Sequence, residues 1–386
     1  MGSATLPNRQ LQSLFVVPYD GAGNQRGTAM STGEDKSRPE ANASARTSWL
    51  VSAAPVPRTG ETMTLMRWTA LVVSSVAVTV PIAALVHIAL AVAPAKAAAA
   101  IKHVIVIAME NTDAGQIYGK LKLAPYINKS IIPKYARAAN FVDPLPIEIE
   151  SEPHYIWMEA GTNVLPDHTF LTDDLPSASN STASKDHLVT QIEASGSATW
   201  MTYQQDIGAA TGKCPAVDSF PYAARHNPFV FFQDVAGTGP DKNSEHCASH
   251  TKAYSEFASD LAAGKMANYV FVTPNLCNDM HGHPKCPKVH RVTAGDKWLS
   301  SELPRIIDWV NNNSGVIFIV WDEGSSTLKI PFLAIGPGIK TNYTSNVEYN
   351  HGSLVRSVEE ILNLPILPAV SKASNLADMF KAGSYP

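Results

Sequence analysis

The stretch His103-Val-Ile-Val-Ile-Ala-Met109, followed by Glu110-Asn111, decides the fold. A nearly continuous run of β-branched residues is typical of a strand that is buried on both faces of a sheet. Three further apolar runs are predicted strands, at 269–273, 316–321 and 331–335. Helical patterns are found at 125–139, 185–194, 251–263, 295–312 and 352–363. Strands that alternate with helices predict an α/β fold.

Polar residues follow three of the predicted strands directly. Ligands of open α/β sheets bind beyond the carboxyl ends of the strands, so these side chains are expected at one rim. They are Glu110, Asn111, Asp279, His281, Asp322 and Glu323. Any one of them has a simpler interpretation as a helix cap or a solvated side chain. Together they gather like charges that a cation would neutralise, which predicts one divalent metal ion: Mg, Ca, Mn or Zn.

Ser151 is a candidate nucleophile. Pro153 stands where the first turn of a helix tolerates proline, which places Ser151 at a helix N-terminus. Free backbone N–H groups there favour an anion, and a neighbouring cation activates a hydroxyl group. The alternative is a serine that only caps the helix.

Four histidines are candidates for balancing an anion or protonating a leaving group. They are His154, His226, His281 and His351. The other histidines of the C-terminal part are interpreted as surface or core residues: His103, His168, His187, His246, His250, His283 and His290.

The first 97 residues have a different character from the rest of the chain. Residues 1–62 are predicted to be disordered, or translated from an upstream start codon. Residues 63–97 form a predicted secretory signal, with an apolar run at 69–92 and Ala95-Lys96-Ala97 before the cut. An uncleaved membrane anchor is the alternative. Both interpretations export residues 98–386, to the periplasm, the medium or the outer face of the membrane.

Export determines how the four cysteines are interpreted. In an oxidising compartment, disulfides are the default, and the pairs Cys214–Cys247 and Cys277–Cys286 each close a short loop. A zinc site in the segment 277–286, which contains Cys277, His281, His283 and Cys286, is the competing hypothesis. The net charge of −4 gives no sign of a nucleic-acid partner.

Seven motifs in order resemble the phosphoesterase family, which contains acid phosphatases and phospholipases C. They begin at His103, Ser151, Arg225, Thr273, Gly295, Val320 and His351. The resemblance implies an alkaline-phosphatase-like, three-layer α/β/α sandwich with a mostly parallel sheet. It implies metal binding by Glu110, Asn111, Ser151, Asp322 and Glu323, with Ser151 also the nucleophile. It places His226, Asp279, His281 and His351 around the phosphate and Asp296 near the substrate. Position 154, where relatives often have Asn, is a histidine in this sequence, and His154 is also expected to contact the substrate.

Departures from the phospholipase branch favour the compact acid phosphatases. Glu110-Asn111 is followed by Thr112-Asp113-Ala114, and Gly324 by Ser325 instead of a second glycine. The expected activity is hydrolysis of phosphate monoesters through a serine phosphoenzyme. The alternatives are a phospholipase C that cleaves phospholipid headgroups and a cation-binding surface module without turnover.

Overall fold

The computed structural model describes residues 100–386. The predicted extension at 1–62 and the predicted signal or anchor at 63–97 lie outside the described residues and stay predictions. Among residues 100–386, no helix combines the length and the apolar character that crossing a membrane requires.

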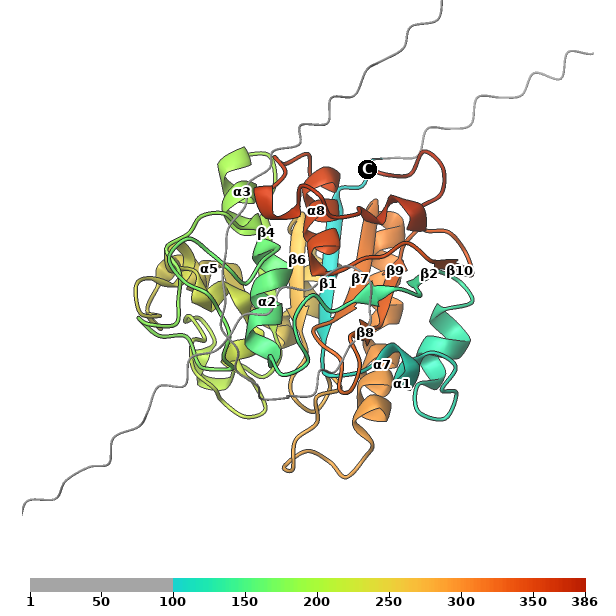
Figure 1. Ribbon diagram of the computed structural model, residues 1–386, viewed down its shortest axis with the longest axis horizontal. Coiled ribbons are helices and arrows are strands. Elements are labelled where there is room, and N and C mark those ends of the chain that lie inside the picture. The colour runs from blue at the N-terminus through green and yellow to red at the C-terminus, as the bar shows by residue number, and fades with distance from the viewer. Residues whose placement is uncertain (1–99) are drawn as a thin grey trace, which may run out of the picture. The chain divides into compact units, whose positions relative to one another are not determined.

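An eight-stranded sheet forms the centre of the fold (Figure 1). Its strand order is β10-β2-β9-β7-β1-β6-β4-β5. Strand β9 runs antiparallel to both of its neighbours, and every other pair is parallel. The strands are β1 (His103–Met109), β2 (Ala136–Ala138), β4 (Trp200–Gln204), β5 (Thr251–Ala253), β6 (Tyr269–Thr273), β7 (Gly315–Trp321), β9 (Phe332–Ile335) and β10 (Tyr343–Ser345). A separate pair joins β3 (Phe141–Val142) to β8 (Lys329–Ile330).

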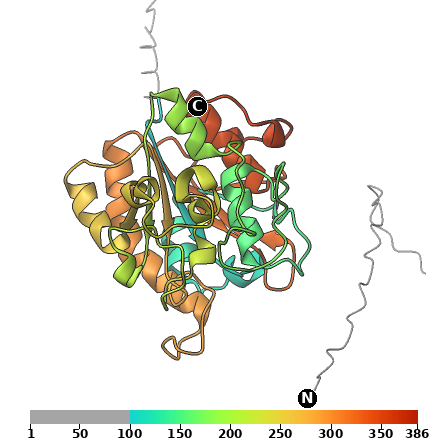
Figure 2. The ribbon, with the colours of Figure 1, turned by 90° about the vertical axis from the view of Figure 1, so that its left-hand side faces the viewer.

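Helices cover both faces of the sheet, as Figure 2 shows in edge view, with α2 and α8 on one face and α6 and α7 on the other. The α-helices are α1 (Ala114–Ile117), α2 (Ser151–Ala160), α3 (Leu188–Ser195), α4 (Gln233–Ala236), α5 (Glu245–His250), α6 (Phe257–Ala262), α7 (Arg291–Asn312) and α8 (His351–Ile361). Single turns of other helix types are η1 (Ile127–Ile131), η2 (Gly208–Ala210), η3 (Ala224–His226), η4 (Pro228–Phe231), η5 (Tyr254–Glu256), η6 (Pro368–Val370) and η7 (Leu376–Met379). The predicted three-layer α/β/α architecture with a mostly parallel sheet is confirmed.

The three strands that carry the polar motifs lie side by side. Strand β1 is flanked by β7 and β6, and both pairs are parallel. All of β7 is buried, and β1 is buried from Val104 onward. The β-branched run that suggested a central strand therefore occupies the centre of the sheet. Its parallel neighbours end at the same rim.

Two of the predicted helices are only partly correct. The segment 125–139 is helical to Ile131, but Pro133 follows, which has no N–H to continue a helix, and Ala136–Ala138 pairs with β9 and β10 instead. The segment 251–263 begins as edge strand β5, and its helix α6 starts at Phe257. In both places tertiary strand pairing overrides the local helical pattern.

The preferred cysteine pairing is confirmed. Cys214 is bonded to Cys247, and Cys277 is bonded to Cys286. No free cysteine remains among residues 100–386, so the competing zinc site, which needs thiolates, is wrong.

Candidate active site

Backbone hydrogen bonds lock the three strand ends together. The amide of Glu110 donates to the carbonyl of Asp279 at 2.8 Å, and the amide of Thr112 donates to the carbonyl of Glu323 at 3.1 Å. The amide of Asp322 donates to the carbonyl of Met109 at 2.9 Å. The loops after β1, β6 and β7 thus form one rigid rim, which brings the predicted carboxylates together.

Asn111 connects β1 to the acidic pair after β7. Its backbone amide donates to Asp322 Oδ1 at 2.9 Å, and its side-chain Nδ2 donates to Glu323 Oε1 at 2.5 Å. Asn111 has a φ of +32°, in the left-handed region that Asn tolerates better than most residues. The unusual backbone turns both the amide and the side chain toward the carboxylates.

Ser151 directs its hydroxyl group into the same cluster. It is the first residue of α2, and the N-cap is Glu150, so the interpretation as a plain capping serine is wrong. Its Oγ lies 3.2 Å from Glu110 Oε2 and 3.3 Å from Glu323 Oε1, so its single proton can be donated to either carboxylate. Along the sequence, Ser151 is 41 residues from Glu110 and 172 residues from Glu323, so only the fold brings these side chains together.

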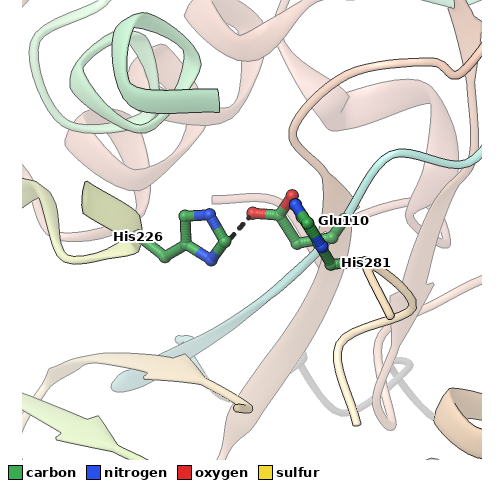
Figure 3. A group of neighbouring side chains, drawn as sticks. All are labelled: Glu110, His226 and His281. Atoms are coloured by element: carbon green, nitrogen blue, oxygen red, sulfur yellow. Dashed lines mark ion pairs between the residues drawn. The ribbon is translucent and has the colours of Figure 1, made fainter. Parts of the chain in front are cut away.

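His226 and His281 lie next to the carboxylate of Glu110, as Figure 3 shows. His226 Nδ1 lies 3.2 Å from Glu110 Oε1 and 3.7 Å from Asp279 Oδ2. The ring of Tyr155 stacks on His226 at 5.1 Å and an interplanar angle of 2°, which fixes its orientation. The backbone amide of His281 donates to Asp279 Oδ1 at 2.7 Å, and this bond positions the residue beside the rim.

His351 lies at the first residue of α8 and is completely buried. Its Nε2 is 3.0 Å from the carbonyl of Trp321, the last residue of β7. Since a carbonyl only accepts, that nitrogen carries the proton and Nδ1 keeps the lone pair. Burial lowers the pKa of His351 to about 4.

His154 does not present a free ring nitrogen to a substrate. Its Nδ1 is 2.9 Å from the carbonyl of Glu150, and its Nε2 lies 2.9 Å from Asp143 Oδ1. Burial opposes protonation of this ring, but Asp143 outweighs it, and the pKa of His154 is raised. The predicted substrate contact of His154 is replaced by a contact with Asp143, a partner that sequence reasoning missed.

Asp296 is also occupied elsewhere. Its carboxylate accepts the backbone amides of Tyr126 and Ile127, both at 2.9 Å, and it is 2% exposed. Asp296 therefore anchors the start of η1 to α7, and the predicted contact with substrate is not supported. The neighbouring Gly295 explains part of this motif, because a Cβ there would lie 2.4 Å from Met280 Cγ in the loop that carries Asp279.

The carboxylates of the rim repel one another. Burial, reinforced by the charge of Asp279, holds the pKa of Glu110 well above its usual value. Burial and the charge of Glu110 do the same for the pKa of Asp322. Burial raises the pKa of Glu323 to about 8, and the charge of Asp322 adds to the rise. Three acidic groups that resist ionisation together, beside the carboxylate of Asp279, form a place that favours positive charge.

The donor set fits a divalent cation. Asp322 Oδ2 is buried and has no hydrogen-bond partner within residues 100–386, and the same holds for Asp279 Oδ2. Glu110, His226 and His281 each offer one ligand atom, and these three atoms lie within 4.8 Å of one another. Buried carboxylate oxygens without partners are costly unless a cation or proton satisfies them.

Arg291 was not predicted, although it joins two loops of the rim. Its Nη1 donates to the carbonyl of Asn111 at 2.7 Å, to that of Met280 at 2.7 Å and to Thr112 Oγ1 at 2.9 Å. In the sequence Arg291 looks like an ordinary residue at the start of a helix. Only the three-dimensional path of the loops reveals its role.

Asp113 holds the loop after Asp322-Glu323. Its Oδ1 accepts the backbone amides of Ser325, Ser326 and Thr327 at 3.0–3.1 Å. A Cβ at Gly324 would lie 1.9 Å from the Thr327 carbonyl, so only glycine allows this tight loop. Asp113 and Ser325, two positions at which this sequence differs from the phospholipase pattern, thus contact each other in the structure.

Comparison with known proteins identifies the family. The model of the phosphoesterase family matches residues 146–365, more than half of the chain. The chain belongs to the phosphoesterase family. This match covers Ser151 and the motifs around His226, Asp279, Asp322 and His351, while Glu110 and Asn111 lie before it.

Curated relatives are fungal acid phosphatases. An acid phosphatase of Aspergillus fumigatus is 28% identical over 168 residues, covering 41% of this chain and 34% of the relative. A phosphate-repressible acid phosphatase of Penicillium chrysogenum is 26% identical over 191 residues, which cover 47% of this chain and 43% of the relative. A probable acid phosphatase of Kluyveromyces lactis is 23% identical over 307 residues, which cover 73% of this chain and 65% of the relative. The matches thus span between a third and two thirds of the length of these relatives.

Solved structures with a similar chain path are more distant. A protein of the alkaline phosphatase superfamily from Vibrio parahaemolyticus has a TM-score of 0.48 at 11% identity, covering 74% of this chain and 71% of that one. Murine ectonucleotide pyrophosphatase/phosphodiesterase 5 in complex with AMP also has a TM-score of 0.48 at 11% identity, covering 72% and 100%.

Proposed function

We propose that the protein is an exported, metal-dependent phosphoesterase that hydrolyses phosphate monoesters through a phosphoserine at Ser151. The observation that carries the proposal is the position of the Ser151 hydroxyl group, at 3.2 Å from Glu110 and 3.3 Å from Glu323. A serine at a helix N-terminus between two buried carboxylates has both an anion-binding backbone and groups that can take its proton.

Glu110, Asn111, Asp322 and Glu323 would hold the metal ion together with the Ser151 hydroxyl group. A bound divalent cation supplies positive charge that lowers the pKa of the hydroxyl group and offsets the charge of the phosphate. The raised pKa values of Glu110, Asp322 and Glu323 support this assignment, because a cation removes the repulsion that causes them.

The reaction proceeds in two balanced steps. Ser151 Oγ attacks phosphorus while its proton passes to a neighbouring carboxylate; the new Oγ–P bond forms as the bond from phosphorus to the alcohol oxygen breaks, and the alcohol oxygen takes a proton from His281. Water then attacks the phosphoserine and gives one proton back to His281, the Oγ–P bond breaks, the carboxylate returns its proton to Ser151 Oγ, and phosphate leaves. Glu110 and Glu323 are the carboxylates within reach of the proton.

His281 is the best placed group for protonating the alcohol. Its Nδ1 is 2.6 Å from the carbonyl of Gly282, so the proton of the neutral ring is on Nδ1 and Nε2 is the atom that can take up and return a second proton. His226 keeps Nε2 without a hydrogen-bond partner among the described residues. Burial lowers the pKa of both rings. An arriving phosphate would favour their protonated forms, and mildly acidic conditions would favour them further.

Two observations support the choice of substrate and compartment. The relatives that match this chain carry names of acid phosphatases, which favours monoesters over lipid headgroups. The two disulfides favour an oxidising compartment, in agreement with the predicted signal at 63–97.

Replacing Ser151 tests the proposal. Ser151→Ala should lower kcat for para-nitrophenyl phosphate by at least about 10³-fold, because the attacking atom is lost. Acid quenching during turnover should leave phosphate on the wild-type peptide that contains Ser151. Ser357→Ala is the matched control: this buried serine of α8 bonds to Ser353 and Leu376 and should retain turnover.

A substrate panel separates the alternatives. Para-nitrophenyl phosphate, a phosphodiester and phosphatidylcholine are compared with and without a chelator. Faster cleavage of phosphatidylcholine would assign a phospholipase C, and no cleavage of any substrate would assign a cation-binding module. If Ser151→Ala stays within about tenfold of wild type, about 1.4 kcal/mol in the barrier, the covalent mechanism is wrong.

A further inference from the structure

Two histidines and one glutamate meet at the surface near α3 and α5, apart from the catalytic rim. Glu193 lies in α3, and His246 and His250 lie one turn apart in α5. All three side chains are partly exposed, at 37%, 35% and 27%. The proposed reaction uses none of them.

The three side chains converge on one point. His246 Nε2 lies 2.6 Å from Glu193 Oε1, and His250 Nε2 lies 3.9 Å from the same oxygen. One ligand atom from each residue lies within 4.8 Å of both others. A tetrahedral cation with bonds of about 2.1 Å separates its ligand atoms by about 3.4 Å, in the middle of these distances.

Backbone carbonyls fix the tautomer of both rings. His246 Nδ1 is 2.8 Å from the carbonyl of Asp234, and His250 Nδ1 is 3.0 Å from the carbonyl of His246. A carbonyl only accepts, so each neutral ring carries its proton on Nδ1 and directs a lone pair at Nε2 toward Glu193. Three acceptors that face one another need a cation or an extra proton between them. Metal-binding histidines are oriented by carbonyl groups in this same way.

The surroundings hold the three ligands in place. Cys247, between the two histidines, is bonded to Cys214, which ties α5 to the loop after η2. Trp200 Nε1 donates to Glu193 Oε1 at 2.7 Å, and the Trp200 ring stacks on His250 at 4.3 Å. The carboxylate and one imidazole are therefore oriented by the same buried indole.

We propose that Glu193, His246 and His250 bind a borderline transition-metal cation of the Zn²⁺ class. Two imidazole nitrogens and one carboxylate oxygen suit Zn²⁺, Co²⁺ or Cu²⁺ and disfavour Mg²⁺ and Ca²⁺, which prefer oxygen ligands. The bound cation would link α3 to α5, and this link is additional to the disulfide.

Zinc titration of the full chain in an Asp322→Asn background tests this site, because that substitution weakens the metal site of the rim. Calorimetry should show one Zn²⁺ per chain, and Zn²⁺ should raise the unfolding temperature, since it binds the folded state. His250→Gln and Glu193→Gln should each lower the Zn²⁺ affinity by at least about tenfold. His168→Gln, a partly buried histidine that lies 3.1 Å from Asn180, is the control and should bind Zn²⁺ normally.

Fluorescence gives a second measurement that does not depend on turnover. Cu²⁺ bound beside His250 should quench the emission of Trp200, and the quenched fraction should disappear in Trp200→Phe. The proposal is overturned if the Asp322→Asn chain binds no Zn²⁺, because a proton then occupies the site. It is also overturned if His250→Gln and His168→Gln bind Zn²⁺ equally. Neither result bears on Ser151, so this proposal and the proposed function fail separately.

Discussion

The two ends of helix α2 contact two groups of buried charges that are built in opposite ways. Its first residue, Ser151, bonds to the rim carboxylates Glu110 and Glu323. Near its other end, Glu159 lies 3.0 Å from His187 Nδ1, and Asp234 lies 3.1 Å from His187 Nε2. Both groups contain buried carboxylates, although Asp234 is 20% exposed, so burial alone does not distinguish a functional site from a structural one.

In the group around His187, each charge has a partner. The backbone amide of Val189 and the hydroxyl group of Thr190 donate to the two carboxylates at 2.8 and 2.6 Å. Burial opposes protonation, but Asp234 and Glu159 together raise the pKa of His187 to about 9. This group joins α2, α3 and α4, and although Glu159 Oε2 has no hydrogen-bond partner among the described residues, the imidazole of His187 lies between the two carboxylates and balances their charge.

At the rim, the charges have the same sign. Burial raises the pKa of Asp279 well above its usual value, and the charge of Asp322 adds to the effect. The guanidinium group of Arg291 donates to backbone carbonyls and Thr112 and does not pair with these carboxylates directly. Unbalanced charge in a fixed frame therefore distinguishes the rim, and the proposed cation site rests on this difference.

The largest effect should come from Asp322, a rim carboxylate whose Oδ2 has no hydrogen-bond partner among the described residues. Asp322→Asn removes one negative charge, and we expect kcat/KM for para-nitrophenyl phosphate to fall by about 10³-fold, with only partial rescue by excess metal. Glu159→Gln, a buried acid of the other group, is the matched control and should keep turnover within about tenfold. If steady-state kinetics show equal losses of kcat/KM in both variants, the rim and the group around His187 do not differ in function.

A smaller effect is expected from the positioning residue of the rim. Arg291→Met removes the bonds to Asn111 and Met280, and we expect kcat to fall by about 10- to 100-fold while substrate KM changes less. Arg305→Met, in the same helix and bonded to Glu302, should leave kcat unchanged. A decrease in stability without a decrease in kcat would show that Arg291 only holds the fold.

The smallest effect on turnover, and a clear effect on stability, should come from His187. A raised pKa stabilises the folded state fully below the unfolded value of about 6.5, and this contribution is lost as the pH rises through about 9. Between these pH limits, the free energy of unfolding of the wild type should therefore fall by about 3 kcal/mol relative to that of His187→Gln. Urea unfolding at pH 6, 8 and 10 measures the difference, and a constant difference would contradict the paired state of His187.

Much of the rim could be predicted from the sequence because each strand is followed directly by its polar residues. Glu110-Asn111 and Asp322-Glu323 are adjacent to β1 and β7, and parallel neighbours end at the same edge. Such a pattern needs no knowledge of distant contacts. The local sequence of the short edge strand β5 and of the strand β2 predicts helix, because both strands depend on pairing partners far away in the chain.

The roles of single side chains were harder to predict. His154 and Asp296 stand in the expected motifs, but His154 contacts Asp143, and Asp296 accepts the backbone amides of Tyr126 and Ile127 at the start of η1. Arg291 and His187 gave no signal, because their partners come from other loops and helices. Local sequence specifies which residues reach the rim, and tertiary contacts decide which of them remain free.

Direct measurement of Mn²⁺ binding tests the central claim, that unbalanced charge at the rim is there to hold a cation. Equilibrium dialysis is carried out at neutral pH with the full chain carrying His246→Gln and His250→Gln, so that the surface site does not contribute. We expect one Mn²⁺ per chain, at least about tenfold weaker binding in Asp322→Asn, and unchanged binding in Glu159→Gln. Absence of Mn²⁺ binding, or an equal loss in both variants, would contradict the account.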